Sequence, residues 1–159
     1  MKDFQLSPHF KFSDFKRSET AKVHGIDNHV PSALIPNLST LCLEVLEPLR
    51  QHFNCPIIIG SDYRSPQLNT LVGGVKNSQH MTGEAADIHI PVYDFVDSKG
   101  QHHTNMDILN KWFTWIMNNC DFDQLIKETA NRRTYWIHVS CKRDRSKNRR
   151  QVISFLLKG

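Results

Sequence analysis

The stretch that decides the fold is residues 78–90, which read SQHMTGEAADIHI. It offers the imidazole of His80, then a tight passage at Gly83, and then the carboxylate of Asp87 in an apolar run typical of a strand. Neutral imidazole and carboxylate are good ligands for Zn²⁺, and a catalytic zinc needs three protein ligands with one position left open. We therefore expect a third ligand from elsewhere in the chain, and His138, in another strand-like run, is the candidate.

The composition is ordinary for a soluble globular protein, with 39% hydrophobic and 23% charged residues in 159. This length favours a single domain, residues 1–159, with a core that needs no staples. No apolar run approaches the roughly 20 residues that cross a bilayer, and residues 1–15 lack the apolar core of a secretory signal. We therefore expect a monomer without a membrane span, made in the cytoplasm without a signal peptide.

The cysteines and the net charge suggest no second site. Four cysteines, at positions 42, 55, 120 and 141, form no C-x-x-C pair and are interpreted as buried free thiols. The net charge of +4 gathers in residues 142–150, where six bases accompany one acid. Such a run is either a solvated loop or a contact surface for a polyanion. No aromatic-interleaved binding motif accompanies it, so we do not expect a nucleic-acid partner.

Periodicity and capping signals place the elements before this stretch. Residues 18–25 predict a short helix that begins after Ser18 and stops at Gly25. The apolar spacing of residues 37–53 predicts a core helix that bends at its proline. Residues 55–60 are predicted to form a buried strand, and residues 66–72 a helix with Ser65 as N-cap.

The same reasoning continues after the stretch. Residues 85–90 predict a strand in which Asp87 and His89 share a face, so His89 is a rival metal ligand. Residues 93–105 are predicted to be a polar loop. Residues 106–117 are predicted to form an amphipathic core helix.

Residues 122–128 and 134–141 are expected to form two further strands, and residues 151–157 predict a closing strand. If the pair forms a hairpin with an odd-length loop, Gln124 and Glu128 share a face with His138, whereas an even loop turns them away.

Three segments together resemble a known family. They are SDYRSPQLN at residues 61–69, the S-x-H-x-x-G-x-A-x-D string at residues 78–87, and Trp-Ile-His at residues 136–138. They are similar to the zinc D-Ala-D-Ala carboxypeptidase family, whose group includes bacteriophage L-alanyl-D-glutamate endopeptidases and the Hedgehog signalling domain. The likeness covers nearly the whole chain and is closest to a compact bacterial and phage branch.

The resemblance implies an α+β fold, in which a small antiparallel sheet carries a zinc site and helices pack on one side. It also implies roles for individual residues. His80, Asp87 and His138 match the zinc ligands; Glu128 and Arg64 are assigned to catalysis, and Ser78, Arg64 and Gln124 to substrate binding.

Two positions depart from the family pattern. Asp62 stands where many relatives carry glycine, which puts an acid two residues from Arg64. The better-known carboxypeptidases have their catalytic acid within a few residues before the last histidine, where this chain has Thr134 and Tyr135. Glu128 is the nearest upstream carboxylate, so we assign it the role of general base.

The expected function is zinc-dependent hydrolysis of an amide bond in peptidoglycan stem peptides, by a carboxypeptidase or an endopeptidase. Such an enzyme would reach the cell wall through the periplasm or by phage-mediated release. The alternative is a catalytically inactive zinc-binding module that contacts the cell wall or another protein, because such a module keeps the ligands and loses the base.

Overall fold

A computed structural model describes residues 2–90, 94–96 and 98–158. Within these residues, five strands form one sheet, and two hairpins of two strands each lie apart from it. In chain order the strands and α-helices are β1 (Gln5–Ser7), β2 (Phe10–Lys11), α1 (Glu19–Val23), α2 (Ile35–Leu41), α3 (Glu47–Phe53), β3 (Ile58–Ser61), α4 (Pro66–Leu71), β4 (Ala85–His89), β5 (Asp94–Val96), β6 (His102–Thr104), α5 (Asn105–Asn119), β7 (Gln124–Thr129), β8 (Tyr135–Ser140) and β9 (Gln151–Leu157).

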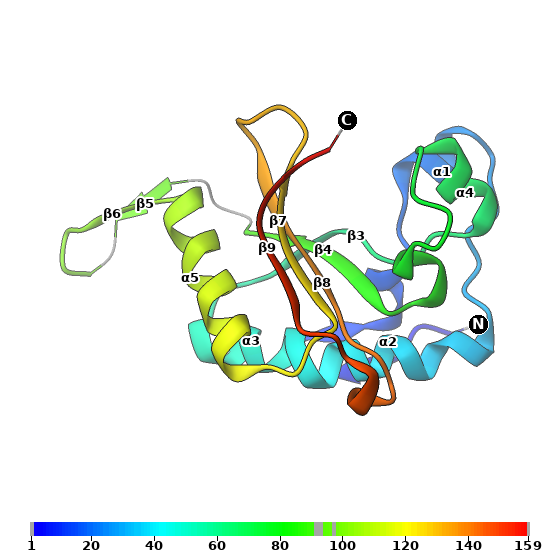
Figure 1. The fold of residues 1–159 in the computed structure, drawn as a ribbon, viewed down its shortest axis with the longest axis horizontal. Coiled ribbons are helices and arrows are strands. Elements are labelled where there is room, and N and C mark those ends of the chain that lie inside the picture. Colours follow the sequence, from blue (N-terminus) through cyan, green and yellow to red (C-terminus); the bar gives the residue numbers. More distant parts are fainter. Residues whose placement is uncertain (1, 91–93, 97, 159) are drawn as a thin grey trace.

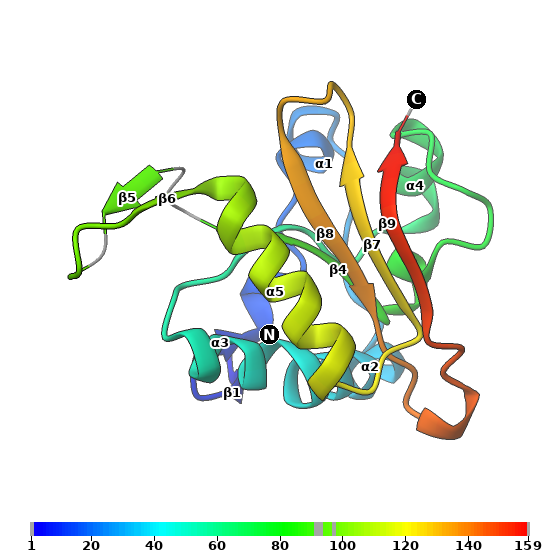
Figure 2. The same cartoon turned by 60° about the vertical axis from the view of Figure 1, so that its left-hand side comes forward.

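The main sheet has the order β3-β4-β8-β7-β9. The expected antiparallel pairing holds for β3, β4, β8 and β7, whereas β9 runs parallel to β7. The reason is that β4 and β7 already occupy both edges of β8. The chain therefore passes the end of β8 and adds β9 to the free edge of β7, in the same direction as β7 (Figure 2).

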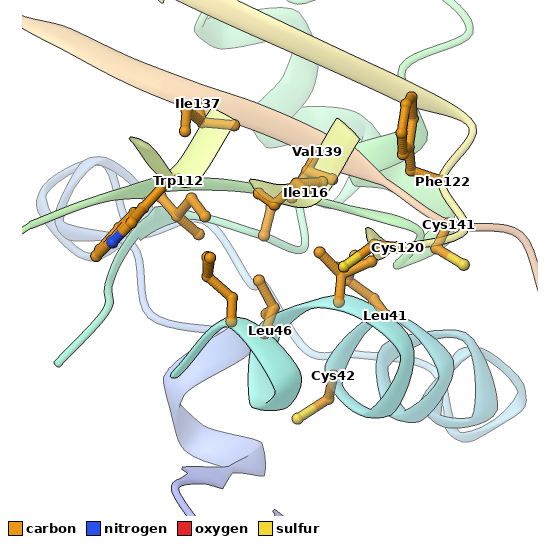
Figure 3. Packing of buried hydrophobic residues seen from close by; sticks show 14 of the residues in the cluster. Leu41, Cys42, Leu46, Trp112, Ile116, Cys120, Phe122, Ile137, Val139 and Cys141 are labelled. Carbon is orange, nitrogen blue, oxygen red and sulfur yellow. The ribbon is translucent and has the colours of Figure 1, made fainter. Parts of the chain in front are cut away.

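One face of this sheet packs on helices and forms the core. The α+β class is confirmed: α2, α3 and α5 lie together below and beside the sheet, whereas the short helices α1 and α4 lie apart from them (Figure 1). Figure 3 shows Trp112 and Ile116 of α5 against Ile137 and Val139 of β8. Because side chains alternate along a strand, the residues between these apolar positions point to the opposite face, where His138 lies.

The long core helix predicted for residues 37–53 is a helical run in three parts. A π-helical turn, Cys42–Leu46, separates α2 from α3, so the irregularity begins ahead of Pro48. Proline has no N–H to donate to the preceding turn. One residue before Pro48, the N–H of Glu47 donates to the carbonyl of Cys42, five residues earlier, which is the π-helical spacing. The apolar stripe is buried as predicted, with Leu38 and Leu49 fully enclosed.

The predicted caps are confirmed at two short helices. The Ser18 side chain accepts from the Ala21 N–H at the start of α1, and the Ser65 side chain accepts from the Leu68 N–H at the start of α4. Both side chains satisfy a backbone donor that the first helical turn leaves open.

Two predicted elements differ from the structure. The strand expected to be buried at residues 55–60 is β3, and it lies at the edge of the sheet with Ile58 39% exposed. A short β-branched run looks the same in a central and an edge strand, because the sequence does not show what pairs with it. Part of the expected polar loop forms the β5–β6 hairpin. Tyr93, its first residue, lies outside the described residues. None of the described helices has the length and apolar character that crossing a bilayer requires.

Candidate metal centre

The β4–β8 pairing places two of the predicted ligands side by side. Asp87 lies directly opposite His138. His80 comes from a short 3-10 helix, Gln79–Thr82, which ends at Gly83 with φ +73° before the chain enters β4. A Cβ at Gly83 would lie 3.2 Å from a methyl group of Leu38, so a side chain here is disfavoured by both the backbone angle and the space.

The donor atoms of His80, Asp87 and His138 lie within 4.8 Å of one another. His80 Nε2 is 3.3 Å from Asp87 Oδ1, and His138 Nδ1 is 3.0 Å from the same oxygen. Two ligands that bind zinc at about 2.0–2.1 Å with tetrahedral angles lie about 3.3 Å apart. The spacing of the three side chains therefore fits a zinc ion.

The orientation of His80 makes the fit stronger. Its Nδ1 lies 2.7 Å from the Asp62 carbonyl oxygen, which only accepts, so Nδ1 carries the ring proton. Burial lowers the pKa of His80, although the charge of Asp87 opposes this effect, so the ring is neutral near pH 7. Nε2 then presents a lone pair to a carboxylate oxygen. Two acceptors facing each other favour a cation between them.

The pKa values of two aspartates at this site, Asp87 in the cluster and Asp62 beside it, are shifted in opposite directions. Burial alone would raise the pKa of Asp87, but the neighbouring imidazoles of His80 and His138 outweigh it and hold that pKa far below its usual range. Asp62 is fully buried, and neither of its carboxyl oxygens has a hydrogen-bond partner among the described residues. Burial and the charge of Asp87 raise the pKa of Asp62 well above its usual value. The departure at this position therefore adds a buried acid whose pKa is raised, and the backbone carbonyl of the same residue lies within hydrogen-bond distance of His80 Nδ1.

Arg64 lies at the rim of the cluster. Its backbone N–H donates to the His80 carbonyl at 3.0 Å, and its Nη1 donates to Asn69 Oδ1 at 3.1 Å. Burial lowers the pKa of the guanidinium, whereas the charges of Asp87 and Glu128 raise it. Gly74 allows this arrangement, since a Cβ there would lie 2.1 Å from Asn69 Oδ1 and 2.7 Å from Arg64 Nη1.

Glu128 faces the same side of the sheet as His138. The loop between the paired residues Thr129 and Tyr135 is residues 130–134, an odd number, so Glu128 lies opposite Trp136 and shares a face with His138. Glu128 is only 2% exposed. Burial and the charge of Asp87 both raise the pKa of this carboxyl. The odd-loop alternative is therefore the one that the structure adopts.

A cleft of ≈ 470 Å³ opens over this face. Glu128 lines it together with the three residues assigned to substrate binding, Ser78, Arg64 and Gln124. Ser78 Oγ accepts from the His80 N–H at 3.3 Å, so this serine also supports the turn that carries the histidine.

His89, the rival ligand, lies outside the three-residue cluster. It lines a neighbouring pocket of ≈ 280 Å³ beside Asp87, and its Nδ1 lies 3.1 Å from the Ile90 carbonyl oxygen. The shared face of Asp87 and His89 therefore does not bring both into one donor set.

The basic run is tied to the fold by several of its arginines. Arg149 pairs with the buried Asp123 at 2.7 Å, and Arg145 pairs with Glu44 at 3.1 Å. Arg150 donates to two backbone carbonyls at the end of α5. The four cysteines are free thiols as expected, and three of them are buried while Cys55 is partly exposed.

The sequence profile described as Peptidase M15 matches residues 8–106, more than half of the chain. A comparison with curated proteins finds no match. The α+β fold and the possible His-Asp-His metal site are compatible with a metallopeptidase. The chain belongs to the Peptidase M15 family, whose members are zinc-dependent peptidases.

Proposed function

We propose that this chain is a zinc peptidase that hydrolyses an amide bond in peptidoglycan stem peptides, with His80, Asp87 and His138 as the zinc ligands. The observation that carries this proposal is the convergence of two imidazoles and one carboxylate, far apart in the sequence, on a space between them. The neutral His80 ring, held by the Asp62 carbonyl, presents its lone pair to that space. A partner at the second nitrogen is typical of metal-binding histidines.

The chain's own residues supply the remaining roles. A zinc ion bound here would supply Lewis acidity, which lowers the pKa of water to about 7 and polarises a carbonyl group. Glu128 takes a proton from water and delivers it to the leaving amine, a task for which a carboxyl pKa raised by burial is suited. Arg64, half-buried at the rim, donates to the oxygen that becomes negative during the reaction.

The substrate assignment rests on the family likeness and on the residues of the cleft. Ser78, Arg64 and Gln124 offer a hydroxyl, a guanidinium and an amide along its walls, which suits a peptide with free polar groups. We propose that the chain acts as a monomer at the cell wall. Cleavage at either end or in the middle of a stem peptide is compatible with this proposal.

The test separates an enzyme from a zinc-binding module. The wild-type protein, loaded with zinc, is expected to hydrolyse purified peptidoglycan stem peptides, and removal of zinc with a chelator should stop this until zinc is restored. Glu128→Gln keeps the side-chain volume and is expected to lower kcat by about 10²–10⁴-fold, because the base is lost. Its zinc content should remain that of the wild type.

Chromatography with mass spectrometry measures the products, and atomic absorption measures the metal. Retained zinc without hydrolysis by the wild-type protein would favour the inactive module. Full activity of Glu128→Gln would show that another group acts as the base.

A further inference from the structure

Two side chains without an assigned role hold the carboxylate of Glu128. Trp136 lies directly opposite Glu128 in the β7–β8 pair, and its indole N–H donates to Glu128 Oε2 at 2.9 Å. Lys158 follows β9, and its ammonium group lies 3.7 Å from Glu128 Oε1. The N–H of Lys158 donates to the Thr129 carbonyl at 2.8 Å, so the backbone fixes the end of β9 beside β7.

We propose that Trp136 and Lys158 are positioning residues for Glu128: Trp136 fixes the rotation of its carboxylate, and Lys158 keeps that carboxylate ionised. With Oε2 occupied by the indole, Oε1 is the oxygen left to accept a proton. This inference rests on the proposed role of Glu128 as base.

The surroundings of Glu128 explain why it needs such support. The carboxyl is buried, and a buried carboxylate is costly unless hydrogen bonds and opposite charge compensate it. The ionisable groups that act on it come from four parts of the fold: Asp87 on β4 opposes its ionisation, whereas His138 on β8 and Lys158 after β9 favour it. Arg64, which precedes α4, also interacts with its charge. A base that stays protonated at neutral pH cannot take a proton.

The pairing of Glu128 with Trp136 also bears on the absence of an acid directly before His138. Glu128 reaches the site from the neighbouring strand, and its partner across the strands is Trp136, two residues before His138. Because Glu128 lies on β7, the backbone of β8, which carries His138, does not itself orient this carboxylate. The indole hydrogen bond provides that link.

Lys158 is tested by the pH profile of the zinc-loaded enzyme. Lys158→Met removes a cation and should raise the pKa of Glu128, so the acid limb of kcat/KM moves up by as much as about 0.7 pH unit, the upper end for a half-exposed pair. Lys158→Arg should restore the limb. Lys147→Met, a matched change at an exposed lysine of the basic run, should leave it unchanged.

Trp136 is tested by a substitution that keeps an aromatic ring but loses the N–H. Trp136→Phe should lower kcat by about 10–100-fold, the effect of losing a hydrogen bond to a charged group, with KM and zinc content unchanged. Trp115→Phe on α5 is the matched control. A raised KM at unchanged kcat, or lost zinc, would show a merely structural role and overturn the proposal for Trp136.

A readout without substrate keeps this inference separate from the proposed function. The side-chain carboxyl of Glu128, assigned in ¹³C NMR spectra by its absence in Glu128→Gln, is titrated in the zinc-loaded protein and its variants. An upward shift in Lys158→Met and Trp136→Phe supports the proposal even if no peptide is cleaved. An unchanged titration in both variants overturns it. Activity retained by Glu128→Gln overturns the assigned base instead.

Discussion

Two aspartates, Asp87 and Asp123, are both well shielded from solvent, yet their partners are of opposite kinds. Asp123 is 0% exposed and accepts hydrogen bonds from Arg149 at three nitrogens, at 2.7–3.0 Å, and from Gln79 at 2.9 Å. Asp87 instead faces ring nitrogens of His80 and His138. Adjacent residues, Gln79 and His80, thus contact the two acids.

The difference teaches how a structural carboxylate can be told from a candidate ligand. A buried charge that donors surround completely has its desolvation cost offset within the protein, so it fixes the fold and has nothing to offer a metal. Asp123 is of this kind, and it ties the basic run to the start of β7. A buried carboxylate whose neighbour presents a lone pair has no compensating positive charge on that side until a cation binds. Asp87, beside the Nε2 atom of His80, is of this second kind.

The largest expected effect concerns the histidine that completes the set. His138→Ala should reduce zinc affinity by more than about 100-fold, the upper end for changes to outer partners of a ligand, and hydrolysis should be lost with it. His89→Ala is the matched control on the same face of the sheet and should keep its zinc. Competition with a fluorescent chelator measures both affinities. Zinc loss in His89→Ala rather than His138→Ala would make His89 the ligand.

A smaller effect is expected at the first of the two aspartates. Asp87→Asn keeps an oxygen at the same place but removes its charge, so zinc affinity should fall by about 10–100-fold, comparable with changes to outer partners. Activity at low zinc should fall in parallel and recover partly at high zinc. Unchanged affinity in Asp87→Asn would remove the contrast with Asp123.

The smallest effect on the metal site is expected at Asp123. There the substitution should mainly reduce stability. Asp123→Asn should keep zinc and kcat, but lower the free energy of unfolding by about 2–3 kcal/mol, because the buried ion pair with the half-exposed Arg149 is broken. Denaturant unfolding in the presence of a chelator measures this. An equal loss of zinc and stability would mean that Asp123 belongs to the site.

The same variant has a defined pH dependence. Burial alone would raise the pKa of Asp123, but the hydrogen bonds of Arg149 and Gln79 outweigh it and lower that pKa. The stabilisation is therefore present above the unfolded pKa of about 3.9 and is lost as the pH falls through the lower, folded value. The difference in unfolding free energy between wild type and variant should be constant above about pH 5 and shrink below about pH 4.

The amino-acid sequence by itself determined the local chemistry of this protein. The apolar stripes of the core helices, the serine caps at Ser18 and Ser65, and the imidazole and carboxylate around Gly83 follow from side-chain type and spacing over a few residues. The family likeness also rests on such local strings. Each of these signals acts within one or two turns or along one strand, so no knowledge of distant residues is needed.

Only the tertiary structure decided which residues on neighbouring strands face one another. The parity of the loop after Thr129 sets whether Glu128 faces His138, the edges left free on the sheet set the direction of β9, and that direction brings Lys158 to Glu128. The backbone carbonyl of Asp62 orients His80. A pattern of side-chain types does not predict such a contact with a backbone group. These pairings depend on register and on competition between strands for edges, which are properties of the assembled sheet and not of any segment in it.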